Sequence, residues 1–340
     1  MPRTEYCPKI DHRMDRRLSL LAVLALGIAP RAVVAQQPAR LPVVGFLSPG
    51  FPDLVGSSIA ITQLREGLRE SGYIEGKSVL IESRWGLGKP ETLDAFVDEL
   101  VRLKVDVFVA VSPPVVMAAK KATGSLPIVA VDLETDPVAS GLVSSLAKPR
   151  GNVTGLFLDL PELAGKWLQL IRELVPDAQR VAILWDGNTG PYQLDAIRSA
   201  AKILSVELDV VEFREASELE NALAAGLKRR PQALVQLGSP LINGLAYRIA
   251  DFSLKHRLPA VSPFRRFAES GGLLSYGPNL AITFRRTAVY VGRILKGAKP
   301  ADLPIERPTH FEMVVNLKAA KALGIKLPQS VLVRADETIR

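Results

Sequence analysis

The chain has 340 residues, of which 48% are hydrophobic and 23% are charged, and its formal net charge is +8. This composition excludes an intrinsically disordered protein, and the length leaves room for two domains of ordinary size. The basic residues at 228–230 and 285–286 form short clusters that are typical of solvated helix faces. Charge therefore gives little support to a nucleic-acid partner.

The first 35 residues have the three-part pattern of a secretory signal peptide. Arginines at 16–17 precede an apolar run at 18–28, and small residues lead to Ala35. The run is shorter than the roughly 20 residues that a membrane-spanning helix needs. Met14 is an alternative start. Cleavage after Ala35 would place the protein in the periplasm and remove Cys7, the one cysteine of the sequence, so the mature chain would have no thiol chemistry.

Strands and helices then alternate. The apolar runs predict strands at 43–47, 79–85, 106–111 and 127–131. The periodic segments between and after them predict helices at 57–71, 91–103, 113–121 and 137–148. Because no tight hairpin turn joins these strands, we expect a parallel sheet with right-handed crossovers.

The stretch at 126–155 contains the strongest local signals. Its strand is apolar throughout, as in parallel sheets covered on both faces. Asp136 and Pro137 are a suitable N-cap and first helical residue, and they predict the helix that ends near Pro149. Ligands of open α/β sheets bind at such carboxyl ends of strands, beside helix N-termini.

A second half of similar pattern follows. It has expected strands at 180–185, 207–213, 233–237, 259–261 and 272–276. Its expected helices are at 162–174, 192–204, 217–227 and 240–256. Ser217 and Glu220 have the spacing of a capping box.

The C-terminal elements are too small to fold alone. They comprise a helix at 280–295, a Pro-rich connector, a strand at 311–315 and a helix at 317–323. We expect them to complete the two halves. The predicted fold is therefore two doubly wound parallel α/β lobes joined by a multi-crossing hinge, with 36–155 and 276–305 in the first lobe and 156–275 and 306–340 in the second.

The sequence lacks common catalytic motifs. No Gly-rich dinucleotide loop follows the first strand, and neither a Walker lysine loop nor a Gly-x-Ser-x-Gly elbow occurs. His256 and His310 are the histidines that remain after cleavage, and they form no metal-ligand cluster. We therefore assign no catalytic residue, no metal and no cofactor.

The loops at the strand ends instead predict a binding cleft between the halves. Serines at helix starts offer N–H groups to a carboxylate, Asp carboxylates suit an ammonium group, and Tyr rings can stack on an apolar side chain. The candidate ligand-binding residues are Ser48, Gly50, Ser57, Ser58, Ser112, Pro113, Asp132, Thr135, Asp136, Asp186, Asn188, Tyr192, Ser239, Ser262 and Tyr276.

Three segments resemble a known family: DPVASGLVSSLAKPRGNVTG, GGLLSYGPN and the tail from Thr309. They are similar to the ABC-transporter substrate-binding family with the type I periplasmic-binding-protein fold. The resemblance implies uptake of an amino acid, with aromatic ones bound by relatives, and delivery to an ABC permease and its ATPase. We expect a monomer, because such a receptor must present both lobes to the permease. Arg150 departs from the family pattern, which usually has glycine there.

Two alternatives remain. An enzyme could use the same scaffold with Asp132 and Asp186 as acids, because fold does not fix function. A sugar-responsive regulator would need a DNA-binding helix-turn-helix before residue 41, where the sequence has the signal-peptide pattern.

Overall fold

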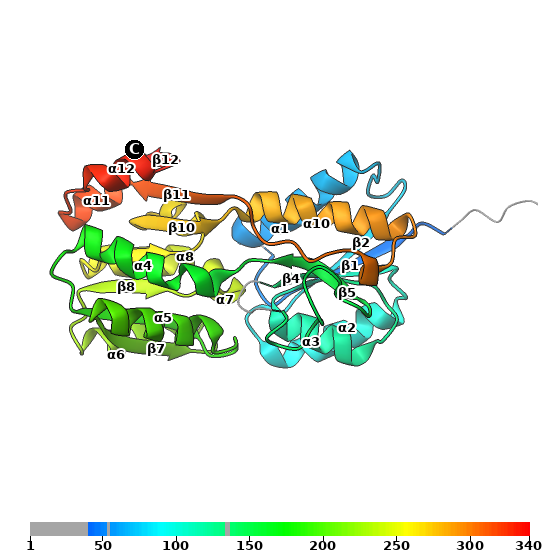
Figure 1. Ribbon diagram of the computed structural model, residues 1–340, viewed down its shortest axis with the longest axis horizontal. Helices are drawn as coiled ribbons and strands as arrows, with labels where there is room; N and C mark the ends of the chain where they lie inside the picture. The colour runs from blue at the N-terminus through cyan, green and yellow to red at the C-terminus, as the bar shows by residue number, and fades with distance from the viewer. Residues whose placement is uncertain (1–39, 53–54, 133–136) are drawn as a thin grey trace, which may run out of the picture. The chain divides into compact units, whose positions relative to one another are not determined.

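The computed structural model describes residues 40–52, 55–132 and 137–340, and residues 41–340 form one compact unit. The predicted signal peptide, Thr135 and Asp136 lie outside the described residues. Within them the chain forms two β-sheets with helices on both faces (Figure 1). This arrangement confirms the predicted pair of α/β lobes.

The first sheet is parallel throughout its described strands. These are β1 (Val43–Ser48), β2 (Leu80–Trp85), β3 (Val107–Val111), β4 (Ile128–Asp132) and β5 (Val153–Phe157), in the order β2-β1-β3-β4-β5. Val44 of β1 lies opposite both Ile81 and Val107. Every residue of β1, β3 and β5 is buried. Their near-continuous apolar sequence therefore reflects a sheet covered on both faces.

The second sheet repeats this order and extends it. Its described strands are β6 (Arg180–Asp186), β7 (Glu207–Phe213), β8 (Ala233–Gln236), β9 (Ala260–Ser262), β10 (Leu274–Pro278), β11 (Phe311–Asn316) and β12 (Glu337–Ile339). The order β7-β6-β8-β9-β10 matches that of the first sheet, and β11 and β12 follow at one edge. β11 is antiparallel to β10, so this sheet is mixed rather than wholly parallel.

Helices of the first lobe pack on both faces of its sheet. They are α1 (Val55–Glu70), α2 (Leu93–Arg102) with the preceding 3₁₀ turn η1 (Pro90–Thr92), α3 (Pro113–Ala122) and α10 (Leu280–Leu295). α1 and α10 lie against each other (Figure 1). A Cβ on Gly67 would lie 2.6 Å from the Arg285 carbonyl oxygen, so this close approach requires glycine. α10 thus joins the first lobe although it follows β10 in the chain.

The second lobe is built around α4. Its helices are α4 (Leu160–Leu174), α5 (Tyr192–Leu204), α6 (Leu219–Leu227), α7 (Pro240–Gly244), α8 (Ala246–Lys255), α9 (Arg266–Glu269), α11 (Leu317–Leu323) and α12 (Gln329–Arg334); a 3₁₀ turn, η2 (Pro300–Asp302), precedes β11. Trp167 of α4 is fully buried, and its indole Nε1 donates to the Tyr276 carbonyl oxygen at 2.8 Å. This bond holds α4 on the second sheet.

The chain passes between the sheets three times, after β5, after β10 and before β11. The expected divisions at residues 155 and 276 fall within β5 and β10. No helix in the described ranges is long and apolar enough to cross a bilayer.

The predicted helix at 137–148 is wrong. From Pro137 to Arg150 the described chain consists of turns and bends. Gly141 has φ +71°, and the hydroxyls of Ser144 and Ser145 both donate to the Lys148 carbonyl oxygen at 3.1 Å. Serine side chains compete in this way with helical hydrogen bonds. Arg150 has φ +58°, a left-handed conformation that favours glycine.

Other boundaries also differ. The capping box at Ser217 is wrong, because Glu218 accepts from the backbone N–H of Arg214 at 2.7 Å and Glu220 pairs with Arg248. The helix expected at 240–256 is interrupted at Leu245, which separates α7 from α8. α12 and β12 had no signal in the hydrophobic pattern.

Candidate ligand-binding cleft

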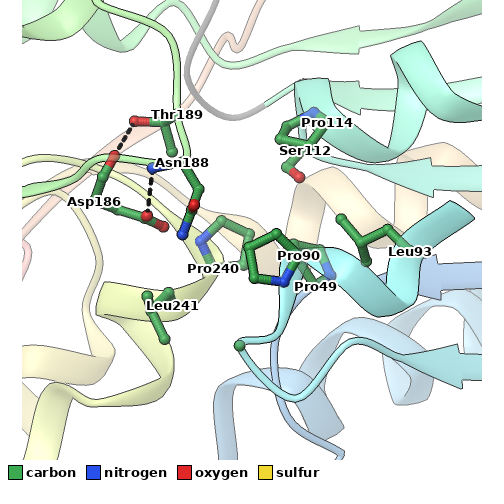
Figure 2. Close-up of a pocket in the computed structure, with 11 residues that line it drawn as sticks. Pro49, Pro90, Leu93, Ser112, Pro114, Asp186, Asn188, Thr189, Pro240 and Leu241 are labelled. Atoms are coloured by element: carbon green, nitrogen blue, oxygen red, sulfur yellow. Dashed lines mark hydrogen bonds between the residues drawn. The ribbon is translucent and has the colours of Figure 1, made fainter. Parts of the chain in front are cut away.

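The strand order of each sheet defines where a ligand would bind. In sheets of this order the switch point is the place where the chain reverses its direction of strand addition. It lies between the neighbouring strands β1 and β3 in the first sheet and between β6 and β8 in the second. A cavity of about 120 Å³ lies between these two switch points. We call it the first hollow. It is lined by Pro49, Gly88, Pro90, Leu93, Ser112, Pro114, Asp186, Asn188, Thr189, Pro240 and Leu241. Figure 2 shows the residues of the two lobes facing each other across it.

Asp186 is the acidic group of the first hollow. It ends β6 and is 4% exposed. Its Oδ1 accepts from the backbone N–H of Asn188 at 3.0 Å, and the nearby Ser239 hydroxyl also favours the charged form. Burial nevertheless raises the pKa of Asp186, because the charged form loses water. A cationic ligand group at this position would offset that cost.

The loop after Asp186 is braced from both sides. The Asn188 amide nitrogen donates to the Arg214 carbonyl oxygen at 2.7 Å, and the Thr189 hydroxyl donates to the Asp186 carbonyl oxygen at 2.8 Å. The Trp185 indole donates to the Thr189 oxygen at 3.1 Å. The carboxylate is thus presented by a rigid loop, which reduces the entropy lost on binding.

Ser112 faces the hollow from the first lobe. It lies between β3 and α3 with φ 74° and ψ 154°, a strained conformation for a residue with a side chain. It is 1% exposed; within the described part of the chain its Oγ makes no N-cap bond and has no hydrogen-bond partner. An N-cap role therefore does not explain the serine. A strained residue with a buried, unbonded hydroxyl at the hollow is typical of a binding site.

The remaining first-lobe lining is apolar. Pro49, Pro90, Leu93 and Pro114 form it, with Gly88 at one edge. Gly88 has φ +71°, and a Cβ there would lie 3.1 Å from Leu241 Cδ1 and 3.3 Å from Phe51 Cζ. Glycine at this position lets the two lobes approach closely.

The structure brings three predicted site residues together in the first hollow: Ser112, Asp186 and Asn188. Others flank it. Ser48 and Gly50 bracket Pro49, and the Ser48 Oγ accepts from the Gly50 N–H at 3.2 Å. Pro113 precedes Pro114. The buried Ser239 caps α7 by accepting from the Ile242 N–H at 3.0 Å.

Other predicted residues lie away from the first hollow. Tyr192 begins α5 and is half-buried. Ser262 is buried at the end of β9. Tyr276 lies within β10, and its ring stacks on Phe311 with centroids 6.4 Å apart, so no ligand is needed to explain it.

The side chains of Ser57, Ser58 and Asp132 lie outside the described part of the structure, as do Thr135 and Asp136 altogether. The backbone of Asp132 ends β4, opposite Phe157.

The sequence interpretation missed the loop after β2, which supplies Gly88, Pro90 and Leu93. The signal was available, because β2 is parallel to β1 and its carboxyl end lies at the same edge of the sheet. Further missed lining residues each lie within three residues of a predicted site residue in the sequence. They include Thr189, Pro240 and Leu241.

Within the described residues, no three His, Cys, Asp or Glu side chains are grouped as a metal site would require. His310 lies far from Asp186 in the chain and lines a separate hollow with Arg286, Glu306 and Arg307.

Comparisons with known proteins define the class. Residues 57–339 match the family model described as ABC transporter substrate binding protein. The chain belongs to this family, whose members bind a small ligand outside the cytoplasm and work with an ABC transporter.

Individual relatives agree with this assignment. A tyrosine-binding protein of Clostridioides difficile is 24% identical over 265 residues, which are 77% of this chain and 75% of that protein. A conserved domain protein of Vibrio cholerae has a TM-score of 0.80 at 23% identity, with 88% of this chain and 100% of that one covered. A Streptococcus pneumoniae ABC domain in complex with L-Trp has a TM-score of 0.80 at 24% identity, with the same coverage.

Proposed function

We propose that this protein is a periplasmic receptor for an amino acid, with an aromatic one preferred, and that it delivers this ligand to an ABC permease and its ATPase. The observation that carries the proposal is the first hollow, where the buried carboxylate of Asp186 faces the unbonded hydroxyl of Ser112 across the two switch points. A carboxylate suits the ammonium group of an amino acid. Relatives named for binding tyrosine and L-Trp support the aromatic side chain.

The proposed mechanism is closure of the cleft. Since both lobes contribute lining residues, a ligand that contacts both binds the closed arrangement more tightly and shifts the population toward it. The permease would then recognise the closed form. We further propose that the signal-peptide pattern at 1–35 directs export and that the receptor is a monomer, so that both lobes remain free to move.

Isothermal titration calorimetry of the chain from residue 36 tests the proposal, with L-tyrosine, L-tryptophan, the other common amino acids and a sugar panel as titrants. We expect an aromatic amino acid to bind and to reduce the radius of gyration measured by small-angle scattering. Binding of sugars alone, or of nothing in the panel, would contradict the proposal.

Recovery of the ligand by mass spectrometry separates the receptor from the enzyme alternative. A receptor returns the ligand unchanged after prolonged incubation. Conversion of the ligand by the wild-type protein but not by Asp186→Asn would favour the enzyme instead.

A further inference from the structure

Arg266 is a buried cation that the proposed binding mode does not use. It begins α9, just after the loop that follows β9, and it is 7% exposed. Its Nε and Nη1 are buried and have no hydrogen-bond partner among the residues that the structure describes. Burial lowers the pKa of its guanidinium, which still remains charged at neutral pH because arginine is effectively always protonated.

The neighbouring Arg265 shows how unusual this is. Arg265 pairs with three carboxylates, those of Glu269 at 2.8 Å, Glu312 at 2.9 Å and Glu337 at 2.7 Å. Among the described residues, Glu269 is the carboxylate that acts on Arg266, and it is already bonded to Arg265. Two buried guanidinium nitrogens without bonded partners are unfavourable for folding. Its presence therefore needs a reason outside the folded chain.

Arg266 lines a second hollow in the same cleft, with a cavity volume of about 410 Å³. The first lobe contributes Phe51, Pro52 and Leu87, and the second lobe contributes Ala216, Gly244, Leu245, Tyr247, Arg248 and Arg266. The volume falls in the range of roughly 300–1,000 Å³ that small-molecule sites have, whereas that of the first hollow is smaller. Its lining combines aromatic and aliphatic side chains with one unbonded cation.

The two hollows are adjacent. The Cβ position of Gly88 is within 3.3 Å of both Leu241, which lines the first hollow, and Phe51, which lines the second. Arg266 also lines a smaller hollow, with Asn243 and Phe264. Arg266 therefore borders the cleft that the switch points define.

We propose that Arg266 binds the carboxylate of the ligand and that the second hollow holds the apolar body attached to it. The planar guanidinium matches a carboxylate in geometry, and Phe51 and Tyr247 suit an aromatic or aliphatic body. This inference rests on the proposed function in that the ligand enters the same cleft. It narrows the ligand to a carboxylate and excludes free amines and neutral sugars.

The test compares ligands that lack one group with variants that lack its partner. L-Tyrosine, tyramine, which has no carboxylate, and 3-(4-hydroxyphenyl)propionate, which has no ammonium group, are titrated into wild type, Arg266→Gln and Arg198→Gln. Arg198 is the control, because it is exposed on α5, pairs with Asp195 and lines neither hollow. We expect wild type to bind L-tyrosine about 10- to 100-fold more tightly than tyramine, the range typical of charge-assisted hydrogen bonds.

Arg266→Gln should lose that preference and bind L-tyrosine and tyramine alike, whereas Arg198→Gln should keep it. A full preference in Arg266→Gln would overturn the proposal. If wild type binds no aromatic amino acid, a thermal-shift screen of benzoate, 4-hydroxybenzoate and aliphatic carboxylates decides the matter. If a carboxylate stabilises wild type but not Arg266→Gln, the carboxylate site is upheld although the amino-acid function fails. If no carboxylate stabilises wild type more than Arg266→Gln, the proposed carboxylate site is overturned.

The melting temperature distinguishes a ligand-binding role of Arg266 from a structural one, because the two roles predict shifts of opposite sign. Because the cation is unbonded in the absence of ligand, Arg266→Met should raise the melting temperature of the ligand-free protein. A melting temperature that falls by several degrees would mean that the guanidinium stabilises the fold itself, and it would contradict the proposal.

Discussion

The two sides of the cleft differ in chemistry. The second lobe presents Asp186, Asn188 and Arg266, whereas the first lobe presents prolines and leucine, with Ser112 as its polar group in the first hollow. Charge recognition is therefore concentrated on one side, and the other side contributes apolar area and one hydroxyl. This difference indicates that a ligand gains its charged contacts from the second lobe and that closure of the first lobe adds the apolar burial.

The largest effect should follow from removal of the second-lobe carboxylate. Asp186→Asn should weaken binding of an amino acid by about 30-fold, since a hydrogen bond to a charged group contributes about 2 kcal/mol. Ser112→Ala should weaken it only about fivefold, because a neutral hydrogen bond contributes about 1 kcal/mol. Calorimetry measures both. Asp195→Asn, an exposed change on α5, is the control. A larger loss at Ser112 would break the proposed asymmetry.

The second prediction concerns the pH dependence of stability and of ligand affinity that Asp186 of the second lobe should cause. The pKa of Asp186 is raised in the folded state, so the folded protein holds this proton at pH values where the unfolded chain has released it. The Asp186 carboxyl therefore contributes to the free energy of unfolding below its pKa in the unfolded chain, which is about 4. This contribution is lost as pH rises through the pKa of Asp186 in the folded protein. Affinity for an ammonium group should change in the opposite direction and rise with pH, because the ionised carboxylate binds the cation.

Denaturant unfolding measures the free energy of unfolding across pH 4 to 8, and calorimetry measures the affinity over the same interval. The contribution of Asp186 to each trend is the difference between wild type and Asp186→Asn. Identical pH dependence in the two proteins would show that Asp186 does not titrate in this interval.

The third prediction compares strain in the cleft with strain elsewhere. Ser112 and Arg150 both have positive φ, and Arg150 is exposed in the turn before β5. Replacement of either by glycine should raise the free energy of unfolding by about 1 kcal/mol, because glycine adopts this conformation without steric cost. Ser112→Gly should also weaken ligand binding, and Arg150→Gly should leave it unchanged. Equal binding by both variants would remove Ser112 from the site.

The smallest effect concerns the contact between the lobes at Gly88. Gly88 and Gly141 both have φ +71°, but a Cβ at Gly141 meets nothing within 4 Å. Gly88→Ala and Gly141→Ala should each cost about 1 kcal/mol of unfolding free energy through the backbone. Gly88→Ala should cost a few tenths more, because Leu241 and Phe51 must shift slightly. The difference between the two variants, from chemical denaturation, isolates that contact.

Regular apolar spacing in the sequence was enough to predict the elements with strong periodicity. α5, α10, α11 and β7 have the predicted bounds, because apolar residues at a regular spacing must face a core. It also indicated Ser112, Asp186 and Asn188, because strand ends of parallel sheets gather at one edge. It did not exclude the false helix at 137–148, where good start signals were overruled by Gly141 and by serine side chains bonded to nearby carbonyls.

The pairing of segments that are far apart in the chain became visible in the folded protein alone. It added β11 antiparallel to β10, placed α10 on α1, and brought Gly88, Leu241 and Phe51 into contact. It also distinguished Arg265 from Arg266, two adjacent arginines of which the first pairs with three carboxylates and the second with none of those in the described ranges. Local sequence carries no record of such differences, because the burial and hydrogen bonding of a side chain depend on residues far away in the chain.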